Sequence, residues 1–125
     1  MSFLLAAIGG ALGGACRYLF SFGLTACCPA GFPWATLLVN AMGSFLLGVC
    51  LGVGLSGSVG DWAGSAFVAV GFCGGLTTFS TFSLEGLELV SKQQWGRFGV
   101  QLAVSLPLCM VLVWLGSAWG ERLLT

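Results

Sequence analysis

The residues best suited to chemistry lie close together in the run GFCGGLTTFSTFS, residues 71–83. Phe79 and Phe82 are three residues apart, so on a helix they share one face. The hydroxyl side chains of Ser80 and Thr81 lie between the two rings in the sequence. The edge of an aromatic ring carries partial positive charge, and a hydroxyl group can donate a hydrogen bond. Such a track favours contact with a small, strongly hydrated anion, although a phenylalanine pair on an apolar helix more commonly packs or faces lipid.

The same run contains a weak point for a helix. Gly74 and Gly75 come just before Thr77 and Thr78, and glycine and β-branched residues all have low helix propensity. Breaking a helix at membrane depth frees backbone carbonyls, which is tolerated only inside protein or around a cavity or an ion. A glycine pair can also serve close packing alone. The excess length of the surrounding apolar run favours a break at residues 74–78.

Three more polar side chains stand in or beside apolar segments: Arg17, Asn40 and Ser105. Asn40 is the only asparagine of the chain, and an amide in a membrane helix either joins helices or lines a path. Arg17 has either a structural role or the role of concentrating anions at a pore mouth. Ser105 either bonds back to its own helix or belongs to the polar path.

Positioning these groups requires a membrane. The chain of 125 residues has only four basic and four acidic residues, and 58% of it is hydrophobic. A soluble domain carries charge on about a quarter of its residues, so we expect an all-α integral membrane protein surrounded by lipid. The zero net charge argues against nucleic-acid binding, and the lack of histidine argues against His-based acid–base or zinc chemistry. We therefore do not expect an enzyme.

Four apolar runs are long enough to cross a membrane, and together they form a single transmembrane domain over residues 1–125. The expected helices are residues 3–26, 34–55, 62–90 and 98–119. Tryptophans near their ends are typical of interfacial anchors, namely Trp34, Trp62, Trp95 and Trp119. Small residues at four-residue spacing predict close helix packing, namely Gly9 with Gly13, Gly10 with Gly14, and Ser44 with Gly48 and Gly52.

The few remaining features add little chemistry. The six cysteines are interpreted as small apolar residues rather than as a disulfide or zinc set.

With the N-terminus inside, only Arg122 lies near a cytoplasmic helix end, whereas Lys92 and Arg97 lie on the opposite side. The side of the membrane with more Lys and Arg residues decides how a membrane protein is oriented, and here the two sides carry nearly equal numbers. Either one residue decides the orientation, or both orientations insert and the functional unit is an antiparallel pair.

Three segments resemble the signatures of the CrcB/Fluc fluoride channels. They are GGALGGACRY at residues 9–18, NAMGSF at residues 40–45, and the run 71–82 with its GGLTTFSTF core. Their order and spacing and the chain length agree with that family over the first three helices, and the third signature is highly specific. The resemblance implies a dual-topology homodimer with two parallel pores, each built from both subunits.

The resemblance also implies roles for individual residues. The fluoride path is lined by Asn40, Phe79 and Phe82, with Ser80 and Thr81 in a polar track. The backbone carbonyls of Gly74 and Thr77 bind a structural sodium ion (Na+) on the dimer two-fold axis. Two carbonyls per chain become four when doubled by a two-fold axis, and a hard cation favours oxygen ligands.

We therefore expect a passive fluoride channel in a bacterial-type inner membrane that exports fluoride and relieves its toxicity. One rival is a small dual-topology multidrug/proton antiporter of similar length. Its mechanism needs a membrane-buried carboxylate in the first helix, and the first acidic residue here is Asp61. A second rival is a structural or unselective pore-forming protein, which does not require a Gly-Gly-Thr-Thr break beside an aromatic and hydroxyl track.

Overall fold

The computed structural model describes residues 1–54 and 64–125, and every regular element in these two ranges is helical. The elements are α1 (Ser2–Cys27), α2 (Trp34–Gly52), the π-helix η1 (Ser65–Cys73), α3 (Gly74–Leu76), α4 (Phe79–Ser91) and α5 (Trp95–Leu123). The elements η1, α3 and α4 follow one another and form the third span, Ser65–Ser91. Four spans in the described residues are long and apolar enough to cross a membrane. The chain is therefore an all-helical, multi-pass integral membrane protein.

The observed bounds differ from the expected ones by a few residues. Helix α2 ends at Gly52 rather than at residue 55, because Val53 and Gly54 form a turn in which Gly54 has a φ of +73°. Helix α5 begins at Trp95 rather than at residue 98, because only residues 92–94 connect it to α4 and Gln93 has a φ of +59°. Residue 62, the expected start of the third helix and one of the expected tryptophan anchors, lies outside the described residues.

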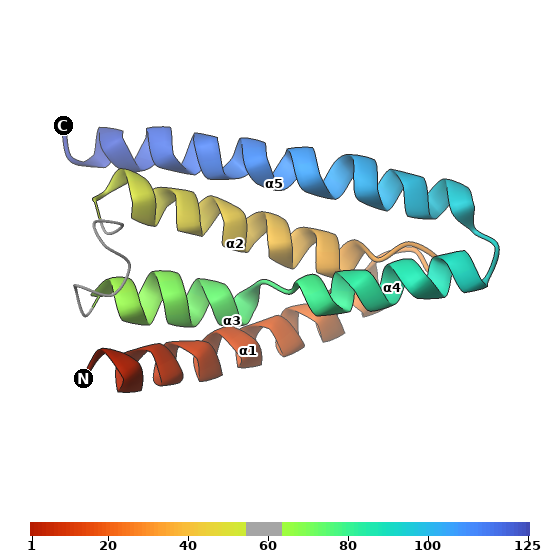
Figure 1. The fold of residues 1–125 in the computed structure, drawn as a ribbon, viewed down its shortest axis with the longest axis horizontal. Helices are drawn as coiled ribbons and strands as arrows, with labels where there is room; N and C mark the ends of the chain where they lie inside the picture. The colour runs from red at the N-terminus through yellow and green to blue at the C-terminus, as the bar shows by residue number, and fades with distance from the viewer. Residues whose placement is uncertain (55–63) are drawn as a thin grey trace.

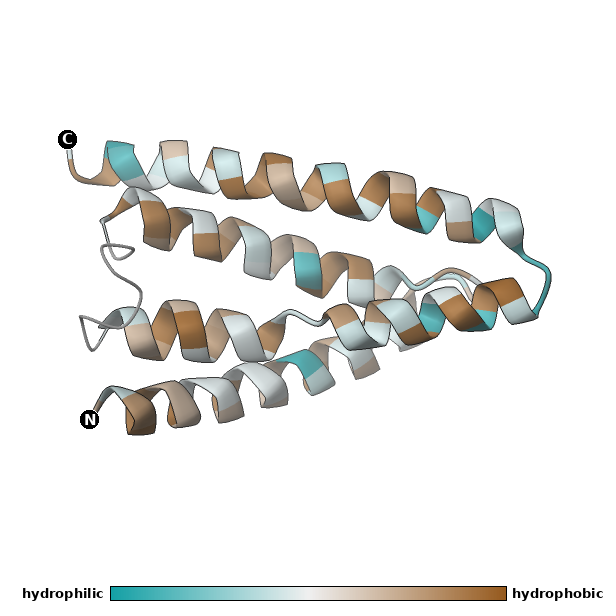
Figure 2. Cartoon of the chain, in the orientation of Figure 1, coloured by the Kyte–Doolittle hydropathy of each residue, from teal (hydrophilic) through white to brown (hydrophobic). Residues whose placement is uncertain are grey.

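The four spans run antiparallel to their neighbours in sequence, and both ends of the chain lie at the same end of the bundle (Figure 1). Helix α1 packs along the third span, and α2 packs along α5. The short connection between α4 and α5 is hydrophilic in Figure 2, whereas most of the helical surface is apolar or neutral. This distribution suits a molecule whose connections meet water and whose helices meet lipid.

Helices α2 and α5 approach closely because glycines leave room for the facing backbone. A methyl group at Gly48 would collide with the Val113 carbonyl of α5. From the other side, a methyl group at Gly116 would collide with the Phe45 carbonyl of α2. The predicted packing role of Gly48 is confirmed, and Gly52 has a similar contact with α5. Association of helices in lipid depends on such close approach, because lipid is as apolar as the side chains.

Glycines on α1 meet the third span in the same way. Methyl groups at Gly9 and Gly13 would collide with the carbonyls of Phe67 and Phe72, so their predicted packing role is confirmed. A methyl group at Gly14 would meet nothing within 4 Å in the described structure, so Gly14 makes no such close contact within the subunit. The α1 helix turns one glycine face to its neighbour, and Gly14 lies off that face.

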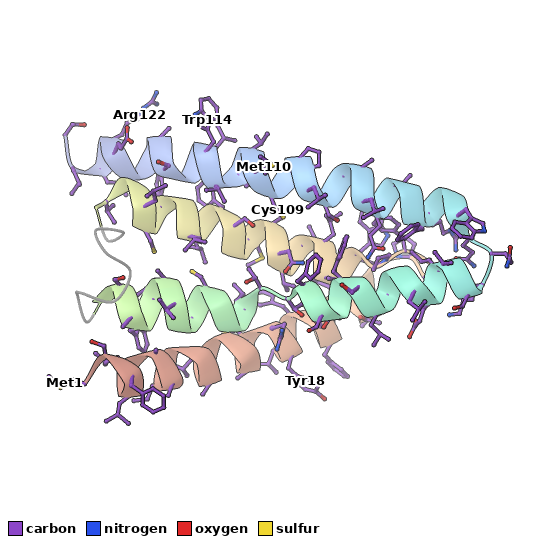
Figure 3. All side chains as sticks on the ribbon, viewed as in Figure 1. Met1, Tyr18, Cys109, Met110, Trp114 and Arg122 are labelled. Atoms are coloured by element: carbon purple, nitrogen blue, oxygen red, sulfur yellow. The ribbon has the colours of Figure 1, made fainter. Side chains whose placement is uncertain are left out.

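The outer surface carries large apolar side chains. Tyr18, Met110 and Trp114 are 71%, 73% and 68% exposed, and Figure 3 shows Tyr18 and Trp114 projecting away from the bundle. In a membrane these side chains meet lipid or another subunit rather than water. Trp114 lies within α5 rather than near its end, so it is not placed like an interfacial anchor.

We expect Gly116→Ala to lower the free energy of unfolding by about 1–3 kcal/mol, the usual cost of overpacking. The reason is the collision of the new methyl group with the Phe45 carbonyl. Gly99→Ala makes the same change on the same helix, where a methyl group meets nothing within 4 Å. Helix propensity favours alanine there, so this control keeps or gains stability. Thermal unfolding in detergent compares the two, and equal stability would contradict the close contact.

Candidate functional site

Two residues in the middle of the third span have extended rather than helical backbone. Thr77 has φ −78° and ψ 154°, and Thr78 has φ −151° and ψ 121°. Helix α3 ends before them and α4 begins after them, which leaves the non-helical connection seen in Figure 1. Gly74 remains helical, with φ −64° and ψ −38°. The extended conformation therefore belongs to the threonines, whose β-branched side chains favour it, and not to the preceding glycine.

Asn40 of α2 holds this extended backbone. The Thr78 N–H donates to Oδ1 of Asn40 over 2.7 Å, and Nδ2 of Asn40 donates to the Thr78 carbonyl over 3.0 Å. One amide side chain thus satisfies both backbone groups of Thr78, as a neighbouring strand does in a sheet. The amide carries two N–H donors, so one remains after the bond to Thr78. Asn40 joins two helices and also lines the groove described below.

This arrangement changes the surroundings of two backbone carbonyls. In a continuous helix the Thr78 N–H would donate to the Gly74 carbonyl, but here it donates to Asn40. The Gly74 carbonyl therefore lacks its helical partner, and the backbone there is exposed. The Thr77 carbonyl lies 3.5 Å from Nη1 of Arg17. These are the two carbonyls that the family resemblance implies as cation ligands, and the half-buried Arg17 lies beside one of them.

The first turn of α4 gathers hydroxyl groups. Oγ1 of Thr78 caps the helix by accepting from the Thr81 N–H over 3.2 Å. The same oxygen lies 3.0 Å from Oγ1 of Thr81 and 3.3 Å from Oγ of Ser80. Helical spacing places Ser80 and Thr81 on different faces, but the capping residue brings both hydroxyls together. The positive end of the α4 dipole lies at the same place.

Phe79 and Phe82 occupy one face of α4, as predicted. Their ring centroids are 5.7 Å apart and their planes are inclined by 27°. Phe82 is only 8% exposed, whereas Phe79 is 74% exposed. One ring therefore belongs to the interior of the subunit, and the other projects from its side.

An open groove of about 310 Å³ brings most of the predicted residues together. Its lining includes Asn40 from α2, Ser105 from α5, and Gly74, Thr77, Thr78, Phe79 and Phe82 from the third span. Ser105 is 7% exposed, so its hydroxyl-bearing side chain lies between helices. Ser80 and Thr81 adjoin the groove through Thr78 but do not line it, and Arg17, which also does not line it, contacts the Thr77 carbonyl. None of the described residues that line the groove is charged.

Residues 4–117 match the model of the family described as CrcB-like protein, Camphor Resistance (CrcB). The chain belongs to the CrcB family. A protein named Fluoride-specific ion channel FluC from Thermus thermophilus is 43% identical over 121 residues, which cover 97% of this chain and 94% of that protein. Proteins of the same name from Shewanella sp. (strain ANA-3) and Shewanella oneidensis are each 40% identical over 114 residues, which cover 91% of both chains.

Two buried polar contacts in this CrcB family member were not predicted. Gln101 of α5 is 1% exposed, and its Nε2 donates to the Phe82 carbonyl over 3.4 Å. Thr36 of α2 donates from Oγ1 to Oε1 of Glu85 over 2.6 Å. Gln101 precedes Ser105 by one helical turn, so a polar residue on the same face of an apolar helix was the available signal.

A second cavity lies near the connection between α4 and α5. It measures about 270 Å³, and its lining includes Gly31, Glu85, Glu88, Lys92 and Gln94. Helix α4 thus begins at the uncharged groove and reaches a charged cavity near its C-terminal end.

We expect Asn40→Leu to lower the free energy of unfolding by about 1–3 kcal/mol for each backbone group of Thr78 left without a partner. Asn40→Asp keeps the acceptor for the Thr78 N–H but loses the donor to its carbonyl, so its loss of stability from unmet bonds should be smaller. Met42→Leu changes an exposed position two residues away and serves as the control. Thermal unfolding ranks the variants, and a stable Asn40→Leu protein would argue against this role.

Proposed function

We propose that this chain forms a fluoride-selective channel in a bacterial inner membrane, and that it exports fluoride passively to relieve fluoride toxicity. The observation that carries the proposal is the relationship to proteins named fluoride-specific ion channels, which covers 91–97% of the chain. The groove lies within the residues matched to the CrcB family. With the cell interior negative, each exported monovalent anion gains roughly 2.3 kcal/mol per 100 mV, so export needs no other energy source.

The groove offers what a small anion requires when it leaves water. Asn40 has an N–H donor beyond the one bonded to Thr78, and Ser105 has a hydroxyl group. The ring edges of Phe79 and Phe82 add partial positive charge without a mobile counterion. Because no charged side chain is among the described lining residues, an anion meets neither a repelling carboxylate nor a cation that would trap it. Ser80 and Thr81 extend this set of donors beside the groove.

We propose that the working unit is an antiparallel, dual-topology homodimer with two pores. The groove is open to the side of the subunit, and the 74% exposed ring of Phe79 lines it. A second copy placed against this side would cover the ring and close the groove. The basic residues Lys92 and Arg97 lie near one end of the bundle and Arg122 near the other, so charge favours neither orientation strongly.

A structural sodium ion at the two-fold axis fits the residues present. The Gly74 carbonyl lacks its helical donor, and Gly74 is exposed in the single subunit, which supports its use as a ligand at an interface with a second subunit. The Thr77 carbonyl has two lone pairs, and the guanidinium group of Arg17 at 3.5 Å engages at most one of them. Both carbonyls are hard oxygen ligands of the kind that an alkali cation favours. The ion is proposed to hold the subunits together, not to be transported.

The antiporter alternative receives no support from α1. A proton-coupled antiporter of this size needs a carboxylate buried in its first helix, and α1 contains neither Asp nor Glu. On α4, Oε1 of Glu85 is engaged by the Thr36 hydroxyl group.

Efflux from liposomes tests the proposed selectivity. Vesicles that contain the purified protein and are loaded with fluoride should empty rapidly, because the groove offers donors for a small anion. Vesicles loaded with chloride should keep their contents. Ion-selective electrodes follow both anions, and empty vesicles report the background leak. Equal rates for the two anions would rule out a fluoride-selective channel.

Phe82→Ile separates anion contact from packing. The change keeps apolar bulk and should cost under about 1.5 kcal/mol of stability, but it removes the positive ring edge. We expect a monodisperse dimer whose fluoride flux falls by about tenfold or more, because a desolvated anion loses a compensating partner. Leu84→Ile alters a 57% exposed position on the same helix and should conduct normally. Unchanged flux in Phe82→Ile would assign the ring to packing alone.

A further inference from the structure

Gln101 is one of the most completely buried side chains of the described structure, at 1% exposure. Its Nε2 donates to the main-chain carbonyl of Phe82 over 3.4 Å. Its Oε1 is buried and has no hydrogen-bond partner in the described residues. Gln101 is not among the residues that line the groove, although Ser105, one turn further along α5, is. The amide therefore acts on the backbone of α4 from outside the groove.

A contribution to stability alone does not explain why a glutamine is buried at position 101. Burying an amide with an unmet acceptor is unfavourable, and an apolar side chain of similar length would fill the same space without that cost.

The carbonyl that Gln101 holds belongs to the residue whose ring lines the groove. Ser105 and Cys109 contribute the α5 side of that groove, and Phe82 contributes the α4 side. The distance between these two sides depends on how α4 sits against α5. A hydrogen bond from α5 to the Phe82 carbonyl fixes that placement at the position of the ring itself.

We propose that Gln101 is a positioning residue for Phe82, which sets the ring against the α5 wall of the groove and thereby tunes anion flux and selectivity. The proposal rests on the proposed function of the chain as a fluoride channel. It assigns Gln101 no contact with the anion. Its effect passes through Phe82, so it disappears when the ring is absent.

The test begins with Gln101→Met, which keeps the unbranched shape and removes the amide. Because an unmet buried acceptor disappears, the dimer should be at least as resistant to heat as the parent protein. Fluoride efflux should nevertheless fall by about three- to tenfold, the factor that corresponds to the loss of one neutral hydrogen bond, and the ratio of fluoride to chloride efflux should fall with it. Leu102→Met introduces the same side chain at the next position of α5 and should leave both unchanged.

A double-mutant cycle identifies the route of the effect. In a Phe82→Ile background, Gln101→Met should change fluoride efflux no further, because the ring that it positions is absent.

Three results would overturn the proposal. The first is unchanged efflux and selectivity in Gln101→Met, in vesicles where the parent protein conducts fluoride. The second is an equal loss of efflux with and without Phe82. The third is a loss of efflux that merely follows a loss of intact dimer, which would assign Gln101 to the fold alone. Failure of the parent protein itself to conduct fluoride would instead remove the proposed function on which this inference rests.

Discussion

The double hydrogen bond between Asn40 and Thr78 is the interaction on which the site depends. A lipid bilayer supplies no partners for backbone N–H and C=O groups, so an extended segment in the middle of a span must find them within the protein. The amide of Asn40 supplies one acceptor and one donor to the same residue. This allows the chain to leave the helical conformation at Thr77 and Thr78 and to begin a new helix at Phe79.

That interaction requires the helices to be placed closely, and glycine makes this possible. Gly9 and Gly13 of α1 meet the backbone of the third span, and Gly48 and Gly52 of α2 meet the backbone of α5. Each contact brings two helices nearer than larger side chains would allow. With the helices placed in this way, residues from α2, the third span and α5 share one groove. Packing and polar contacts are therefore parts of one arrangement, since the amide of Asn40 reaches Thr78 only when α2 lies close by.

The same bond has consequences beyond the scaffold. By taking the Thr78 N–H, Asn40 leaves the Gly74 carbonyl without a helical donor at an exposed surface. Because α4 starts at Phe79, the positive end of its dipole lies at the groove, and a group of hydroxyls gathers around Thr78 beside it. The side of the subunit that carries these groups also carries the exposed ring of Phe79. An exposed backbone carbonyl without a helical donor and a groove lined by hydrogen-bond donors thus arise from one local departure from helix, and the proposed cation and anion sites both rest on it.

Much of this protein follows from its sequence. The scarcity of charge and the length of four apolar runs determine an all-helical membrane protein, because only internally bonded backbone can cross lipid. The helical periodicity places Phe79 and Phe82 on one face, and the structure agrees. The spacing of Gly9 and Gly13, and of Gly48 and Gly52, indicates which faces pack. These features are local, since each depends on residues a few positions apart.

Tertiary structure decided the rest. The sequence places a weak point at residues 74–78, but only the contact with Asn40, 38 residues away in the chain, selects Thr78 as an extended residue. Helical spacing separates Ser80 from Thr81, and the cap at Thr78 brings their hydroxyls together. In the sequence, Gln101 is only one polar residue in an apolar run. Its hydrogen bond to the Phe82 carbonyl exists only because α5 packs against α4. Periodicity tells which residues share a face of one helix, whereas partners on another helix depend on how the helices pack, and in lipid that packing follows from close backbone contacts that no single segment contains.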